Sequence, residues 1–120
     1  MAKIERFTDL KAWQEGHQLV LMIYGVVKTF PKEENFILTT QILRAVISVT
    51  NNLAEGFGRR YYKEKIQFYS MARASLVEVC NQLMIARDVG YLNRKDFDFV
   101  WEQTDKVGRL ITGLIKSIKK

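Results

Sequence analysis

Residues 93–118, NRKDFDFVWEQTDKVGRLITGLIKSI, decide the fold of this chain. Core-type side chains recur in this stretch at alternating steps of three and four residues, the spacing of one face of a packed α-helix. Asn93 can cap the first turn, with Asp96 three residues further on. The pattern predicts an amphipathic helix over residues 94–118. Its seam consists of Phe97, Val100, Thr104, Val107, Ile111, Leu114 and Ile118.

Three further stretches carry helical spacing. They cover residues 8–29, 35–57 and 62–89. The first begins at the candidate cap Thr8 and ends before Pro31, because proline disfavours helix in the preceding residue. The second ends at Gly56-Phe57-Gly58, where glycines permit left-handed backbone, and the third ends at Gly90. Short connections between long helices predict one all-α domain over residues 1–120, an antiparallel up-down-up-down four-helix bundle.

The composition excludes several functional classes. A chain of 120 residues with one cysteine and one histidine has no internal disulfide and cannot build a multi-cysteine zinc centre or a paired Glu-x-x-His di-iron centre. We therefore expect a protein that is not an enzyme and holds no metal and no cofactor. The N-terminus lacks a signal-sequence core, and the longest apolar run, residues 19–27, is too short for a membrane span. These features predict a cytoplasmic protein.

The first helix carries more apolar residues than a bundle core needs. A core-facing helix buries about three positions in seven, whereas residues 19–23 and 26–27 are apolar throughout. The fourth helix also carries further large apolar side chains beside its seam. Large exposed apolar patches usually mark interaction sites, so we expect a homo-oligomer; the alternative is a thick core with a few exposed aliphatic side chains. The predicted interface residues are Leu19, Leu21, Met22, Ile23, Val26 and Trp101.

Positive charge gathers at one end of the predicted bundle. The net charge is +6 at pH 7, and the predicted topology brings both termini and the second connection to the same end. Arginine and lysine bind phosphate and tyrosine stacks on unpaired bases, so this end is a candidate nucleic-acid interface. The alternative is a solvated loop whose tyrosines pack on the bundle. The candidate residues are Arg59, Arg60, Tyr61, Tyr62, Lys63, Lys65, Lys116, Lys119 and Lys120.

Polar side chains also follow the apolar stripes of the second and third helices. If the hairpin turns near residue 60, positions equidistant from the turn face one another, so Arg44 would meet Glu78 and Ser48 would approach Arg73. Buried charges are tolerated only when paired, and we expect a polar lock that fixes helix register. A ligand pocket and solvated helix faces are the alternatives. The lock residues are Arg44, Asn52, Glu55, Arg73 and Glu78.

Several motifs, in this order and spacing, carry a resemblance to a known family. They are FTDLKAW at 7–13, Phe30-Pro31 followed by Glu34, QILRA at 41–45, NLAEG at 52–56, ARASL at 72–76 with Glu78, and GYL at 90–92. The chain resembles the bacterial 23S rRNA intervening-sequence proteins over nearly its whole length. Leu43 and Ala74 depart from the family, which often has arginine and glycine at these positions. Because one of these arginines is absent, the resemblance gives weaker support for a basic surface on the second helix.

The resemblance implies a four-helix bundle that assembles as a ring-shaped homopentamer. It also implies kinship with the accessory protein of diversity-generating retroelements, a basic pentameric barrel thought to bind nucleic acid and a reverse transcriptase. It assigns no demonstrated chemistry to the lock residues, all of which match the family's motifs. We expect a non-enzymatic oligomer that binds RNA or DNA through its basic end; the alternative is a structural adaptor ring that binds a protein partner.

Overall fold

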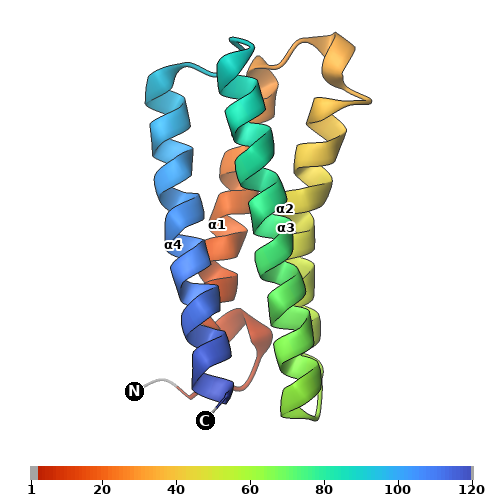
Figure 1. Ribbon diagram of the computed structural model, residues 1–120, viewed down its shortest axis with the longest axis vertical. Coiled ribbons are helices and arrows are strands. Elements are labelled where there is room, and N and C mark those ends of the chain that lie inside the picture. Colours follow the sequence, from red (N-terminus) through yellow and green to blue (C-terminus); the bar gives the residue numbers. More distant parts are fainter. Residues whose placement is uncertain (1–2, 120) are drawn as a thin grey trace.

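The computed structural model describes residues 3–119, and this part of the chain contains helices and no strand. Three short 3-10 turns, η1, η2 and η3, precede or join the first two α-helices (Figure 1). This confirms the predicted all-α fold with four helices. In chain order the elements are η1 (Phe7–Asp9), α1 (Lys11–Val26), η2 (Val27–Thr29), η3 (Lys32–Glu34), α2 (Leu38–Gly58), α3 (Tyr62–Asp88) and α4 (Arg94–Ile118).

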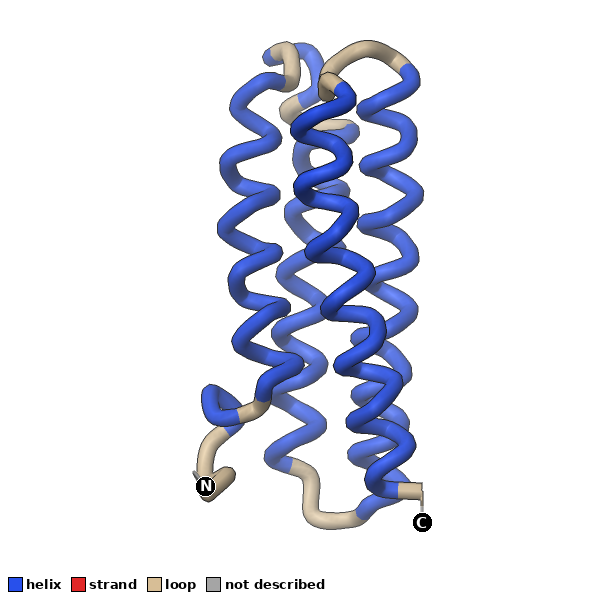
Figure 2. The backbone as a smooth tube through the Cα atoms, turned by 90° about the vertical axis from the view of Figure 1, so that its left-hand side faces the viewer, coloured by secondary structure: helices blue, strands red, loops and turns tan. Residues whose placement is uncertain are grey.

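The four helices form a bundle with extents of 44 × 27 × 20 Å. Each helix packs along two neighbours: α2 lies against α1 and α3, and α4 lies against α3 and α1. The contact between α2 and α3 is the most extensive. Both termini lie at the same end as the α2–α3 turn, and the other two connections lie at the opposite end (Figures 1 and 2).

The first two helices begin later than the sequence predicts. Asp9 Oδ2 accepts hydrogen bonds from the backbone N–H groups of Glu5 and Arg6, both at 3.0 Å, and these bonds hold the pKa of Asp9 below its ordinary value. Residues 7–9 therefore form a separate turn, and α1 starts at Lys11 rather than Thr8. At α2, Glu34 Oε1 accepts the Leu38 N–H at 3.3 Å, so the helix opens at Leu38 rather than residue 35.

The C-terminal ends of α2 and α3 use glycine differently. Gly90 has a φ of +89°, and the Tyr91 N–H donates to the Ala86 carbonyl at 2.9 Å, the closing bond of a Schellman motif. Gly90 ends α3 as predicted. The left-handed stop predicted at Gly56 and Gly58 is wrong, because Gly90 is the one residue with positive φ between residues 3 and 119. Gly56 is instead a buried helical position at which α3 approaches α2 closely.

The core accounts for part of the apolar surplus on α1. Leu19 and Ile23 are fully buried within the single chain, and Val26 is nearly so. Assigning these three residues to an oligomer interface was therefore wrong, since their side chains fill the bundle interior. Leu21 is exposed and Met22 is half-buried, so only these two of the predicted α1 interface residues reach the surface.

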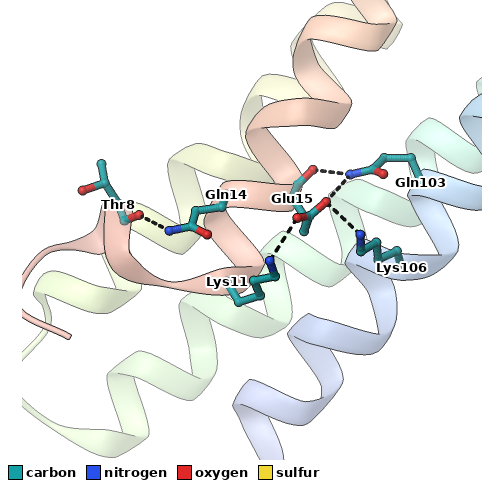
Figure 3. Close-up of polar contacts among 6 residues, drawn as sticks. All are labelled: Thr8, Lys11, Gln14, Glu15, Gln103 and Lys106. Carbon is teal, nitrogen blue, oxygen red and sulfur yellow. Dashed lines mark hydrogen bonds and ion pairs between the residues drawn. The ribbon is translucent and has the colours of Figure 1, made fainter. Parts of the chain in front are cut away.

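A polar bridge joins α1 to α4 (Figure 3). Gln103 Nε2 donates to the Glu15 backbone carbonyl at 2.8 Å and to Glu15 Oε1 at 3.1 Å. The same carboxylate pairs with Lys106 at 3.3 Å and with Lys11 at 3.5 Å. The hydrogen bond from Gln103, followed by the two lysines, holds the pKa of Glu15 below its ordinary value.

We expect Glu15→Gln to lower the free energy of unfolding at pH 7 by about 1 kcal/mol, because both lysine partners are solvent-exposed and add little. A lowered folded-state pKa contributes stability that is present above the ordinary value of 4.5 and is lost as the pH falls through the lowered value. Urea unfolding at pH 7 and pH 3 should show a smaller difference between the two proteins in acid. An equal difference at both pH values would contradict this account.

The matched control is Asp105→Asn, which removes an exposed ion pair with Arg109 on α4. This pair spans one helical turn in solvent and contributes only about 0.3–0.5 kcal/mol. The control should therefore change stability less than Glu15→Gln at pH 7.

Candidate nucleic-acid interface

The termini and the α2–α3 turn lie at one end of the bundle (Figure 2). The segments that form this end carry exposed cations. We call this surface the basic end. The acidic side chains of the same region are Glu5, Asp9, Glu55 and Glu64. The predicted Lys120 lies outside the described residues. The exposed cations of the basic end are Lys3, Arg6, Arg59, Arg60, Lys63, Lys116 and Lys119.

The two arginines of the α2–α3 turn are positioned by aromatic rings. The Arg59 guanidinium lies 4.5 Å from the centre of the Phe68 ring and 3.1 Å from Glu55 Oε2. The Arg60 guanidinium lies 5.8 Å from the centre of the Tyr61 ring. Stacking on a ring holds a guanidinium in place while leaving its edge free for an anion. Because Glu55 and Arg59 are both substantially exposed, their ion pair orients Arg59 without sequestering it.

Both tyrosines of the turn are open to solvent. Tyr61 is 61% exposed and Tyr62 is 69% exposed, so neither packs against the end of the bundle. The packing of the two tyrosines on the bundle, which the alternative to a nucleic-acid interface expected, is therefore wrong. Two aromatic rings beside two arginines provide stacking faces next to phosphate-binding groups.

Lys65 does not belong to the candidate interface. Its ammonium donates to the backbone carbonyls of Phe57 at 2.5 Å and Gly56 at 3.3 Å, and it lies 5.3 Å from the centre of the Phe57 ring. Burial lowers the pKa of this ammonium below its ordinary value. The side chain caps carbonyl groups at the C-terminus of α2. Its inclusion among the phosphate-binding residues was wrong, because its donors are committed to the backbone.

The polar cluster found between α2 and α3 has different members from the predicted polar lock. Ser48 Oγ on α2 and Ser75 Oγ on α3 are hydrogen-bonded at 2.9 Å, and Asn52 Nδ2 donates to Ser48 Oγ at 3.0 Å. Of the predicted residues, only Asn52 takes part. Ser75, which the sequence interpretation missed, is nearly equidistant from the turn with Ser48, so hairpin spacing alone could have found it. The lock is an uncharged cluster between the two helices.

The charged members of the predicted lock lie elsewhere. Glu55 pairs with Arg59 along α2, and Arg73 Nη1 lies 3.4 Å from Thr112 Oγ1 on α4. The expected approach of Arg73 to Ser48 is therefore wrong. Arg44 and Glu78 are exposed and form no ion pair with each other in the described part of the chain. They line a hollow of about 510 Å³ between α2 and α3 instead.

A second, more apolar groove of about 550 Å³ runs between α3 and α4. Trp101 lies here rather than beside α1, and the thiol of Cys80, whose pKa burial raises, shares the lining. Arg73, Arg109 and Lys116 also line it. Lys116 thus contributes both to this groove and to the basic end.

Within residues 3–119, no group of three or more histidine, cysteine, aspartate and glutamate side chains is placed to hold a metal ion. None of the helices in this range is both long and apolar enough to cross a membrane.

Comparisons with known proteins identify relatives of the chain. Among solved structures it is similar to a protein of unknown function from the S23 ribosomal protein family of Bacteroides thetaiotaomicron, with a TM-score of 0.81 and 18% sequence identity. The alignment covers 88% of this chain and 98% of that chain, which shows a shared fold. A search of curated proteins found no match. Residues 8–113 match the family described as 23S rRNA-intervening sequence protein. With most of its length covered by this match, the chain belongs to the 23S rRNA-intervening sequence protein family.

Proposed function

We propose that the protein is a non-enzymatic, cytoplasmic homo-oligomer that binds RNA through its basic end. The observation that carries the proposal is the turn at residues 59–63, where two solvent-exposed tyrosines stand between two arginines and a lysine. Phosphate neutralisation by the cations supplies affinity, and stacking of unpaired bases on the rings favours a single strand over a duplex.

Oligomerisation would multiply this surface. A ring requires two different complementary patches on each subunit. One candidate patch is the outer side of α1 and α4, with Leu21, Met22 and Phe99, and the other is the groove that holds Val77 and Trp101. Subunits related by rotation about the ring axis would place their basic ends on one rim of the ring. The positive electrostatic fields of the subunits would add there. The family resemblance favours five copies. Native mass spectrometry of protein purified without nuclease measures the subunit number and any bound RNA together.

The test of RNA binding is a double charge reversal at the turn, Arg59→Glu with Arg60→Glu. We expect the affinity for a single-stranded RNA of about 12 nucleotides to fall by roughly 100-fold at 100 mM salt, because two cations become two anions in the proposed phosphate path. The slope of log K against log salt should become shallower by about two, one for each lost phosphate contact. Fluorescence anisotropy across a salt series measures both quantities.

The matched control is Arg94→Glu with Lys95→Glu, which makes the same change in net charge at the opposite end of the bundle. These residues begin α4, where acidic side chains suit the helix dipole, so the control should fold normally and bind RNA nearly as well as the wild type. Equal losses in the two double variants would show a non-specific charge effect and contradict the proposed interface.

The adaptor function is a second candidate, favoured by the α3–α4 groove. Its lining combines the apolar surface of Leu76 and Trp101 with three cations, which suits a partner helix bearing acidic groups. An adaptor would co-purify with a specific protein and show no salt-sensitive RNA affinity. The charge-reversal series therefore separates the two functions.

A further inference from the structure

The hollow between α2 and α3 lies on a different part of the molecule from the basic end. Its volume of about 510 Å³ falls within the range of small-molecule sites. We propose that it binds an unpaired guanine nucleotide. The inference extends the proposed function, since single-stranded RNA is one source of such a nucleotide and free guanosine phosphate is the other. The lining residues used below are Phe36, Arg44, Ser48, Glu78 and Gln82.

Gln82 supplies an unused polar group in the wall of the hollow. The residue is only 7% exposed, yet its side-chain oxygen accepts no hydrogen bond in the described part of the chain. A buried amide oxygen without a partner is rare in folded proteins, and such an atom calls for an explanation. The terminal torsion of glutamine is broad and two-fold, so the amide can turn its N–H₂ group or its oxygen toward a ligand. A base with matching polar atoms would satisfy it.

Arg44 and Glu78 supply opposite charges from the two helices. Both line the hollow, both are exposed, and neither forms an ion pair within the described residues. A carboxylate accepts two hydrogen bonds side by side, and guanine is the base whose N1–H and N2–H₂ groups offer two adjacent donors on one edge. The second N2–H of guanine would donate to Gln82 Oε1, which is the acceptor that lacks a partner. The Arg44 guanidinium can then bind the phosphate through a bidentate contact.

Phe36 provides a stacking face at the edge of the hollow. Its side chain is 93% exposed, although a phenylalanine gains most from burial. It precedes α2 and lines the same space as Glu78 and Gln82. Aromatic stacking holds an unpaired base by its face while hydrogen bonds specify its edge. The hollow thus combines an aromatic ring, a carboxylate, a free amide and a guanidinium.

The distance to the basic end shapes the experiment. Arg44 and Arg59 are separated by fifteen positions that are nearly all helical, about 22 Å along α2. A mononucleotide can therefore occupy the hollow without touching the basic end, whereas an RNA of about 12 nucleotides can reach both. Guanosine 5′-monophosphate tests the hollow alone, and single-stranded RNA with or without one guanosine tests the two surfaces together.

We expect isothermal titration calorimetry to show guanosine 5′-monophosphate binding about tenfold more tightly than adenosine 5′-monophosphate. Glu78→Gln should abolish this preference while leaving adenosine 5′-monophosphate binding unchanged. The same substitution on α4, Glu102→Gln, is the matched control and should leave the preference intact. Equal binding of the two nucleotides, or no binding of either, to the wild-type protein would overturn the proposal.

A second variant separates binding from folding. Gln82→Leu replaces a buried amide whose oxygen has no partner by an apolar side chain of similar size, so the urea midpoint should stay the same or rise. Guanosine 5′-monophosphate binding should nevertheless weaken by about tenfold. A lower urea midpoint with unchanged nucleotide binding would mean that Gln82 serves packing alone and would overturn its assigned role.

The two proposals fail separately. If the hollow binds no nucleotide while the Arg59/Arg60 reversal still abolishes RNA binding, the guanine site is wrong and the basic end stands. If the reversal leaves RNA affinity unchanged while guanosine 5′-monophosphate binds with its expected preference, the guanine site stands and the basic end is wrong.

Discussion

Gly56→Ala should lower the free energy of unfolding by about 1–3 kcal/mol, although alanine favours helix more than glycine does. A Cβ atom at this position would lie 2.6 Å from Tyr69 Cε1, 2.8 Å from Tyr69 Cδ1 and 3.0 Å from Phe68 Cβ. Tyr69 is fully enclosed by the core and has no room to retreat. The methyl group would force apart α2 and α3, the pair of helices with the most extensive contact in the bundle. Thermal unfolding should show a drop in Tm of about 5–15 °C.

Gly25→Ala is the matched control. Gly25 is an exposed helical position in α1, and an added Cβ there meets no atom within 4 Å. The substitution should stabilise the protein by about 0.5–1 kcal/mol through helix propensity alone. If both variants were stabilised, the close approach at Gly56 would not exist in solution.

Leu19→Ala should destabilise the protein by about 2–5 kcal/mol, whereas Leu21→Ala should change the stability of the single chain by less than about 1 kcal/mol. The two leucines stand two positions apart on α1, but Leu19 is fully buried and Leu21 is 52% exposed. Truncating Leu19 leaves a cavity in the core, while truncating Leu21 removes surface that water already covers. Urea denaturation at low protein concentration measures both effects.

The Leu21→Ala variant also tests the proposed homo-oligomer. If Leu21 lies in the oligomer interface, Leu21→Ala should shift native mass spectra toward smaller species without lowering the stability of the monomer. A wild-type protein that stays at 14.0 kDa at micromolar concentration would contradict the oligomer. An oligomer unaffected by Leu21→Ala would remove this residue from the interface.

The sequence predicts the helices because their periodicity is strong, as α4 illustrates. Asn93 caps it by accepting the Asp96 N–H at 2.8 Å, and the seam positions Val107 and Ile111 are fully buried. Helix starts were less predictable where local side chains compete with the backbone. The turn at residues 7–9 depends on Asp9, and the start of α2 depends on the Glu34 carboxylate, which also accepts the Tyr91 hydroxyl at 2.8 Å. The latter bond joins residues distant in sequence, which no local pattern reveals.

The candidate site was predictable at the level of topology and less so at the level of side chains. The α2–α3 turn and the termini share one end, so the position of Arg59 and Arg60 followed from helix order. The capping role of Lys65 could not be predicted in this way. A lysine in the first turn of a helix has the same sequence context whether it faces solvent or backbone carbonyls. Gln82 was missed because its unpartnered oxygen becomes visible only once its neighbours are placed.

The Glu15–Gln103 bridge has a consequence for the order of folding. The two residues are 88 positions apart, so the seam between α1 and α4 closes almost the whole chain into a loop. The α2–α3 hairpin is joined by a turn of only three residues. Contacts with short loops form earlier because they lose less chain entropy. We therefore expect the hairpin to form first and the α1–α4 seam last, so that this seam is the place where the folded protein opens at the lowest free energy.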